Sequence, residues 1–133
     1  METPSAYAYF RVVAETLPLE EITQAMGIVP TDSWQKGDPG QYVASRPDSG
    51  WCLYSALPRT NTDLMAHIES LLSLLAPRAK AVQELGQRYA TYLVCVGSYD
   101  ETASPGLFIA RESIALIASL GLALDADLYF GKQ

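Results

Sequence analysis

The sequence predicts an α+β domain, in which a mixed, largely antiparallel sheet has helices packed on its face. Three features of the sequence predict this fold class. Runs rich in Tyr, Phe and Val indicate strands, amphipathic stretches that end at Gly indicate helices, and clusters of Gly, Pro and Asp indicate the turns between them. The expected order of elements is β-α-β-β-α-α-β-β-α-β, and this order implies an α+β fold.

Length and composition limit the architecture and the class of partner. At 133 residues and 49% hydrophobic, the chain is long enough for one well-buried core and too short for two ordinary domains, so we expect a single domain over residues 1–133. The formal charge is −6 and the Lys and Arg residues are scattered, which argues against a nucleic-acid partner. The sequence has neither an export signal nor an apolar run near the ~20 residues of a membrane span, so we expect a cytoplasmic protein without membrane contact.

The first half of the chain is expected to form a strand, a helix and a hairpin. Residues 6–15 alternate in polarity and predict a strand. The helix covers Leu19–Met26, because a preceding proline suits a first helical turn and Gly27 terminates the helix. Two strands near residues 41–45 and 50–55, joined by a Pro-Asp-Ser-Gly turn, predict the hairpin.

Three helical stretches are expected in the second half. Asn61 or Thr62 can cap the first of them, and Pro77 should break or bend its end. The expected stretches are an apolar stripe from Leu64 to Leu75, a helix over residues 78–85 that ends at Gly86, and a helix over residues 112–120 that ends at Gly121.

The strands of the second half are expected at residues 89–96, 106–110 and 126–130. The first of these is apolar almost throughout, so we expect a central strand covered on both faces. Two helices end in a similar way, at Gly27 and at Gly121, each after a strand and a short amphipathic helix. This similarity suggests a weak β-α-β pseudo-repeat. The general preference for glycine at the end of a helix explains it equally well.

No catalytic residue is predicted. His67 is the only histidine, with Asp63 four residues before it and Ser70 three residues after it on the same expected helix. An ordinary Asp–His helical pair is favoured over a catalytic triad, because a regular helix offers neither a strained nucleophile turn nor oxyanion donors.

No metal site, cofactor or disulfide is predicted either. Asp125 and Asp127 should share one face of a strand, where edge protection or simple solvation is favoured over binding of a divalent cation. Cys52 and Cys95 each lie in an apolar run without C-x-x-C spacing, so buried free thiols are favoured over a disulfide or a metal site.

The strongest functional signal is the loop that follows the first helix, because long loops of specific composition often carry function. Trp51 begins an apolar run and is expected in the core, whereas Trp34 is equally compatible with a binding anchor and with a lid on the local core. The expected partner-binding residues are Asp32, Trp34, Lys36, Asp38, Tyr42 and Asp48. The three acidic residues among them should steer a basic partner.

The sequence resembles the bacterial domain-of-unknown-function family 4279 over nearly its whole length. The motifs that carry the resemblance are Gly27-Ile28-Val29-Pro30-Thr31, Trp34-Gln35-Lys36-Gly37-Asp38, Gly50-Trp51, Leu120-Gly121 and Asp125-Ala126-Asp127-Leu128-Tyr129. The resemblance implies no catalytic residues. Small single-domain proteins of this kind are frequently encoded beside polymorphic toxins, which by analogy implies an immunity-type role.

Two functions from different classes follow as expectations. The first is a cytoplasmic protein-binding domain of the immunity type, which neutralises a basic toxin domain by direct binding. The alternative is a small-molecule-binding protein or minor enzyme with a pocket between the loop over residues 27–50 and the sheet. That pocket would be surrounded by Trp34, Lys36, Asp38 and Tyr42.

Overall fold

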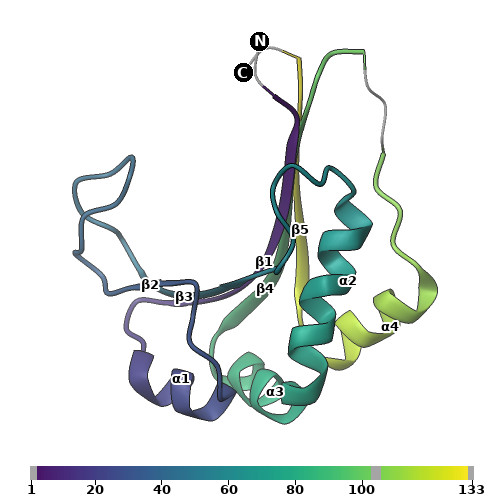
Figure 1. Cartoon of the computed structure of the whole chain (residues 1–133). Helices are drawn as coiled ribbons and strands as arrows, with labels where there is room; N and C mark the ends of the chain where they lie inside the picture. Colours follow the sequence, from purple (N-terminus) through teal and green to yellow (C-terminus); the bar gives the residue numbers. More distant parts are fainter. Residues whose placement is uncertain (1–2, 103–105, 132–133) are drawn as a thin grey trace.

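A computed structural model describes residues 3–102 and 106–131 of the chain (Figure 1). One curved sheet carries all the helices on one of its faces. The strands are β1 (Ser5–Ala14), β2 (Asp32–Trp34), β3 (Ser49–Tyr54), β4 (Ala90–Tyr99) and β5 (Ala123–Phe130). The helices are α1 (Leu19–Met26), α2 (Leu64–Leu75), α3 (Ala79–Arg88) and α4 (Arg111–Ser119), with a short 3-10 turn (Ala76–Arg78) between α2 and α3.

The strand order across the sheet is β2-β3-β1-β4-β5. All neighbouring strands are antiparallel except β4 and β5, which are parallel, so the predicted α+β fold with a mixed, largely antiparallel sheet is confirmed. Since β1 and β2 are each antiparallel to β3, they run in the same direction. β1-α1-β2 and β4-α4-β5 are therefore both β-α-β units, although β3 separates the strands of the first unit.

The core lies between the sheet and the helices. Along β1, alternate side chains are buried, and the buried set (Ala6, Ala8, Phe10, Val12) faces the helices. Trp51 and Leu53 of β3 and Leu93 and Cys95 of β4 point to the same side and belong to the same core cluster. The apolar stripe of α2 covers them, as the sequence pattern predicts.

The helix ends follow the sequence in most places. α1 has the predicted bounds, and Gly27 and Gly121 adopt the left-handed conformation at φ 67° and 74° that ends a helix. Two predictions are wrong. Asp63, not Asn61 or Thr62, caps α2 by accepting hydrogen bonds from two backbone N–H groups. α3 continues through Gly86, because a single glycine weakens a packed helix without ending it.

Two predicted strands are absent from the described residues. The segment 41–45 belongs to a loop whose backbone groups bond within the loop, as Arg46 N does to the Asp38 carbonyl at 2.8 Å, and the strand that pairs with β3 is β2 instead. The segment 106–110 is an irregular lead into α4, and Phe108 is 73% exposed. Neither segment has a neighbouring strand, and a strand without partners is not stable.

Side chains on both faces of β4 are buried, as predicted, but helices cover only one of the two faces. The strand is central, between β1 and β5, but the helices pack on one face only. On the other face Val94 and Val96 are nevertheless buried, because side chains of the neighbouring strands, such as Tyr9 opposite Val94, flank them. No helix within the described part of the chain has the length and apolar character to cross a membrane.

Candidate functional site

The sheet face opposite the helices is uncovered, and we call it the open face (Figure 1). Strand register decides which side chains share it, because paired residues point to the same side of a sheet. From β2 to β5 these are Asp32 and Trp34, Cys52 and Tyr54, Tyr7, Tyr9 and Arg11, Tyr92, Val94 and Val96, and Asp125 and Asp127. The open face is therefore aromatic at its centre and acidic toward both edges.

Three tyrosine rings from two strands stack on the open face. The ring centroids of Tyr9 and Tyr54 are 4.7 Å apart, and Tyr7 lies 5.9 Å from Tyr54 and 6.1 Å from Tyr9. The Arg59 guanidinium covers Tyr7, with 3.9 Å between its central carbon and the ring centroid. Arg59 reaches this position because its backbone carbonyl accepts a hydrogen bond from Ala6 N, which ties the chain after β3 to β1.

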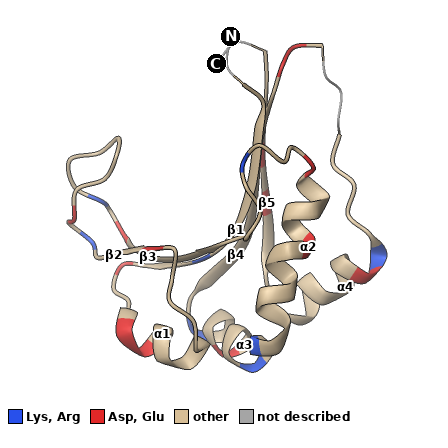
Figure 2. Cartoon of the chain, in the orientation of Figure 1, with Lys and Arg blue, Asp and Glu red and all other residues tan. Residues whose placement is uncertain are grey.

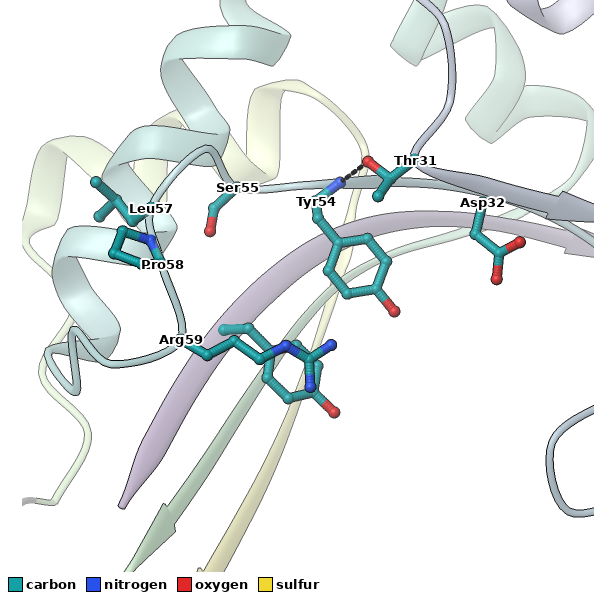
Figure 3. Close-up of a pocket in the computed structure, with 8 residues that line it drawn as sticks. Thr31, Asp32, Tyr54, Ser55, Leu57, Pro58 and Arg59 are labelled. Atoms are coloured by element: carbon teal, nitrogen blue, oxygen red, sulfur yellow. Dashed lines mark hydrogen bonds between the residues drawn. The ribbon is translucent and has the colours of Figure 1, made fainter. Parts of the chain in front are cut away.

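A hollow of about 490 Å³ adjoins this stack (Figure 3). Its lining residues are Tyr7, Thr31, Asp32, Tyr54, Ser55, Leu57, Pro58 and Arg59. The backbone N–H of Tyr54 donates to Thr31 Oγ1 at 3.0 Å, which ties the segment before β2 to the end of β3. Asp32 and Arg59 lie at opposite sides of Tyr54 and give the hollow one acidic and one basic rim.

Burial raises the pKa of two groups on the open face, Tyr54 and Cys52. Desolvation is the largest effect on Tyr54 and raises its pKa to about 12, although Arg59 acts in the opposite direction. The Cys52 thiol on the same face also has its pKa raised to about 12 by burial. Both groups are therefore protonated at neutral pH, and Cys52 does not act as a nucleophilic thiolate.

We expect the stability of the protein to fall as pH rises from 10 toward about 12, partly through Tyr54. A folded-state pKa above the ordinary value of 10.0 stabilises the fold fully below pH 10, and this contribution is lost as pH rises through about 12. Urea unfolding across this range should show that the free energy of unfolding falls less steeply with pH in Tyr54→Phe than in the wild type. Tyr42→Phe, at a side chain 89% exposed, is the matched control and should behave like the wild type.

Trp34 folds back onto the sheet and is half-buried. Its ring covers Gly50, where an added Cβ would come within 2.3 Å of the ring. The indole Nε1–H donates to the Asp48 carbonyl at 3.0 Å, and the Arg46 guanidinium lies 4.0 Å above the ring centroid. These contacts fix the base of the loop over residues 35–48, which we call the arm.

The other predicted binding residues divide between holding the arm and facing solvent. Lys36 pairs with Glu15 at 2.7 Å, and Asp38 accepts a hydrogen bond from Gln35 N at 2.9 Å. Tyr42 near the tip of the arm, Asp48 near its base and Asp32 on the open face are exposed. The structure does not bring the six residues together around one pocket, and only Asp32 lines the hollow.

Replacing Gly50 with Ala should release Trp34 from the sheet, because the new methyl group occupies the space of the ring. The cost should be about 1–3 kcal/mol, as is usual for overpacking. Tryptophan fluorescence should shift toward that of an exposed indole. In a Trp34→Ala background the same substitution should cost little, and an equal cost in both backgrounds would show that the clash is not with Trp34.

His67 is fully buried and has other partners than its helix neighbours. Its Nε2–H donates to the Asn61 carbonyl at 2.7 Å, and its Nδ1 shares a 2.7 Å hydrogen bond with the Ser55 hydroxyl. Asp63 is occupied as the cap of α2, and Ser70 Oγ accepts from Ala56 N. The favoured Asp63–His67 pair is therefore absent, since the imidazole points into the core and ties the loop after β3 to α2.

Cysteines and acidic residues form no metal site within residues 3–102 and 106–131. Cys52 and Cys95 are buried free thiols, as predicted. No group of three or more His, Cys, Asp or Glu side chains there is arranged to hold a metal ion. Asp125 and Asp127 lie on the outer strand β5, at the edge of the open face.

Sequence reasoning missed the tyrosine stack. Tyr7 and Tyr9 follow the same alternation that identifies β1, and that alternation already placed them on the face opposite Phe10. The missing step was the position of Tyr54, which depends on the register of β3 against β1. Nothing in the sequence predicted the position of Arg59, because the loop that carries it has no hydrophobic periodicity.

Comparison with known proteins identifies the family of this chain and nothing further. The sequence matches no curated protein and no solved structure. The model of one family, described as "Domain of unknown function (DUF4279)", matches residues 4–131. Because the match covers almost the entire chain, the protein belongs to the DUF4279 family.

Proposed function

We propose that this chain is a protein-binding domain of the immunity type, which neutralises a protein partner by covering part of its surface with the open face. The observation that carries the proposal is the uncovered sheet face with four half-buried tyrosines, namely Tyr7, Tyr9, Tyr54 and Tyr92. An aromatic sheet face that no helix of the described chain covers is the kind of surface that commonly marks an interaction site.

The side chains of the open face have the composition of a binding hot spot. Tyrosine and arginine dominate the energetics of protein interfaces, since they contribute large contact areas and polar tips at low entropic cost. The tyrosine stack and the Arg59 contact with Tyr7 hold these side chains in place before binding. A pre-ordered surface loses less entropy when a partner binds.

The charge of the chain favours a basic protein as the partner. The formal charge is −6. By strand register, Asp32 on β2 and Asp125 and Asp127 on β5 flank the open face on both sides. Figure 2 marks the acidic positions along the ribbon in red. These carboxylates would repel a nucleic-acid backbone and attract cationic side chains. The immunity-type role itself rests on analogy with small proteins encoded beside polymorphic toxins. We place its action in the cytoplasm, where buried free thiols such as Cys52 and Cys95 stay reduced.

A second candidate function is supported by the hollow beside Tyr54. A volume of about 490 Å³ is sufficient for a small ligand, and its acidic and basic rims suit a molecule that carries both charges. This would be the small-molecule-binding alternative, located on the open face rather than around the arm. A metabolite that co-purifies with the protein and is lost in Tyr54→Ala would favour it.

Site-specific photo-crosslinking in native cells tests the proposed function. A photoreactive amino acid at position 54 should trap one protein in near-stoichiometric yield, and the same group at position 84, exposed on α3, should not. The association rate of the trapped partner should fall as salt rises, because steering between opposite charges is screened over ~10 Å at 0.1 M. Equal trapping at both positions, or an association rate insensitive to salt, would contradict the proposal.

A further inference from the structure

Arg11 lies at the centre of the open face and has no anionic partner among the residues that the structure describes. Its position on the central strand β1 is opposite Cys52 on one side and Tyr92 on the other. Its Nε atom is buried and makes no hydrogen bond within the described part of the chain, and no carboxylate there pairs with the guanidinium. Buried polar groups are nearly always hydrogen-bonded, so an unpaired guanidinium nitrogen requires an explanation.

The guanidinium group of Arg11 packs against an aromatic ring of the neighbouring strand β4. The central carbon lies 5.0 Å from the ring centroid of Tyr92, which is a cation–π contact. Arg11 as a whole is half-buried, and its terminal nitrogens make no hydrogen bond within the described part of the chain. A planar guanidinium presented in this way binds a carboxylate through two parallel hydrogen bonds, and its partly desolvated position strengthens them.

The charges around Arg11 form a pattern across the sheet. Asp32 stands on the same rung two strands to one side, and Asp125 and Asp127 stand on β5, two strands to the other side. Two strand spacings amount to about 10 Å. The open face therefore presents Arg11 on its central strand and Asp32 about 10 Å away on the same rung. Asp125 and Asp127 lie farther away on the other side, because they stand two and four residues beyond the rung of Arg11 on β5.

We propose that Arg11 is the receptor for a carboxylate of the protein partner, and that the partner surrounds this carboxylate with cationic side chains that meet Asp32 on one side and Asp125 and Asp127 on the other. The inference rests on the proposed function and specifies its partner. On such a partner the carboxylate would pair with Arg11, and the surrounding basic groups would pair with the carboxylates at the two edges of the open face. Tyr9 and Tyr92 flank the contact and exclude water from it.

The first experiment uses the free protein with acetate as the probe. In spectra of ¹⁵N-labelled arginine side chains, the Arg11 Nε–H signal should shift progressively with acetate, and the signal of Arg88, exposed at the end of α3, should stay in place. Sodium chloride at equal ionic strength is the control for screening. An Arg11 response no larger than that of Arg88 would overturn the inference, and a stronger response to inorganic phosphate would reassign the site to phosphate.

The second experiment uses the partner trapped at position 54. Arg11→Glu should weaken its binding roughly 100-fold or more, and Arg88→Glu less than about threefold. Replacing one Asp or Glu of the partner by Arg should restore binding to Arg11→Glu alone. If binding survives Arg11→Glu while crosslinking at position 54 persists, this inference fails and the proposed function stands. An acetate response at Arg11 without any trapped protein would leave the anion site standing and refute the proposed function.

Discussion

Truncating Trp51 to Ala should lower the free energy of unfolding by about 3–5 kcal/mol, the usual cost of removing a fully buried aromatic side chain. The indole is completely buried, its ring meets Phe10 edge-on at 6.0 Å, and its Nε1–H donates to Thr23 Oγ1 at 3.0 Å. These contacts join β3 to β1 and to α1, so the loss affects three elements at once. The melting temperature should fall by roughly 10–20 °C.

Two variants serve as controls for this prediction. Trp51→Phe keeps a ring against Phe10 but removes the donor to Thr23, and it should cost about 1–2 kcal/mol. Trp34→Ala removes a half-buried ring at the base of the arm and should cost clearly less than Trp51→Ala. Equal and large losses for the two Trp→Ala variants would assign both rings to the core and would contradict the distinction between them.

Replacing His67 with Ala should lower the free energy of unfolding by about 2–4 kcal/mol. We expect no enzymatic activity that depends on this residue. The substitution opens a cavity and leaves the Asn61 carbonyl and the Ser55 hydroxyl without their partner in the interior. Denaturant unfolding measures the loss. Ser70→Ala, which removes a 3.3 Å contact at the surface, is the control and should cost less than about 1 kcal/mol.

His67→Ala, together with Ser55→Ala, tests whether Ser55 and His67 form a catalytic pair. A serine 2.7 Å from a histidine has the spacing of a nucleophile and its base. The imidazole is fully buried, however, and the nearest backbone donors are occupied, since Ser55 N bonds to the Ala8 carbonyl and Ala56 N to Ser70 Oγ. Neither of these two N–H groups is therefore free to stabilise an oxyanion, and we expect no catalysis by this pair. Turnover of an ester that is lost in both folded Ser55→Ala and His67→Ala would overturn this conclusion.

Local sequence determined those parts of the structure whose physics is local. The bounds of α1, the break near Pro77 and the left-handed ends at Gly27 and Gly121 follow from backbone preferences of single residues. The burial of Trp51 and of the two thiols follows from apolar runs, which can be satisfied only in a core. These features needed no knowledge of which strands are neighbours.

The tertiary structure alone decided the site. The open face exists because all the helices pack on one side, and an apolar strand such as β4 carries the same pattern whether helices or neighbouring side chains bury its second face. Segment 41–45 has the composition of a strand, yet β2 occupies the place beside β3 and leaves it in the arm. Tyr54 meets Tyr9, and Arg11 stands between two acidic edges, only through the register of strands far apart in the chain. Pairing between distant strands depends on the whole sheet, so no local pattern encodes it.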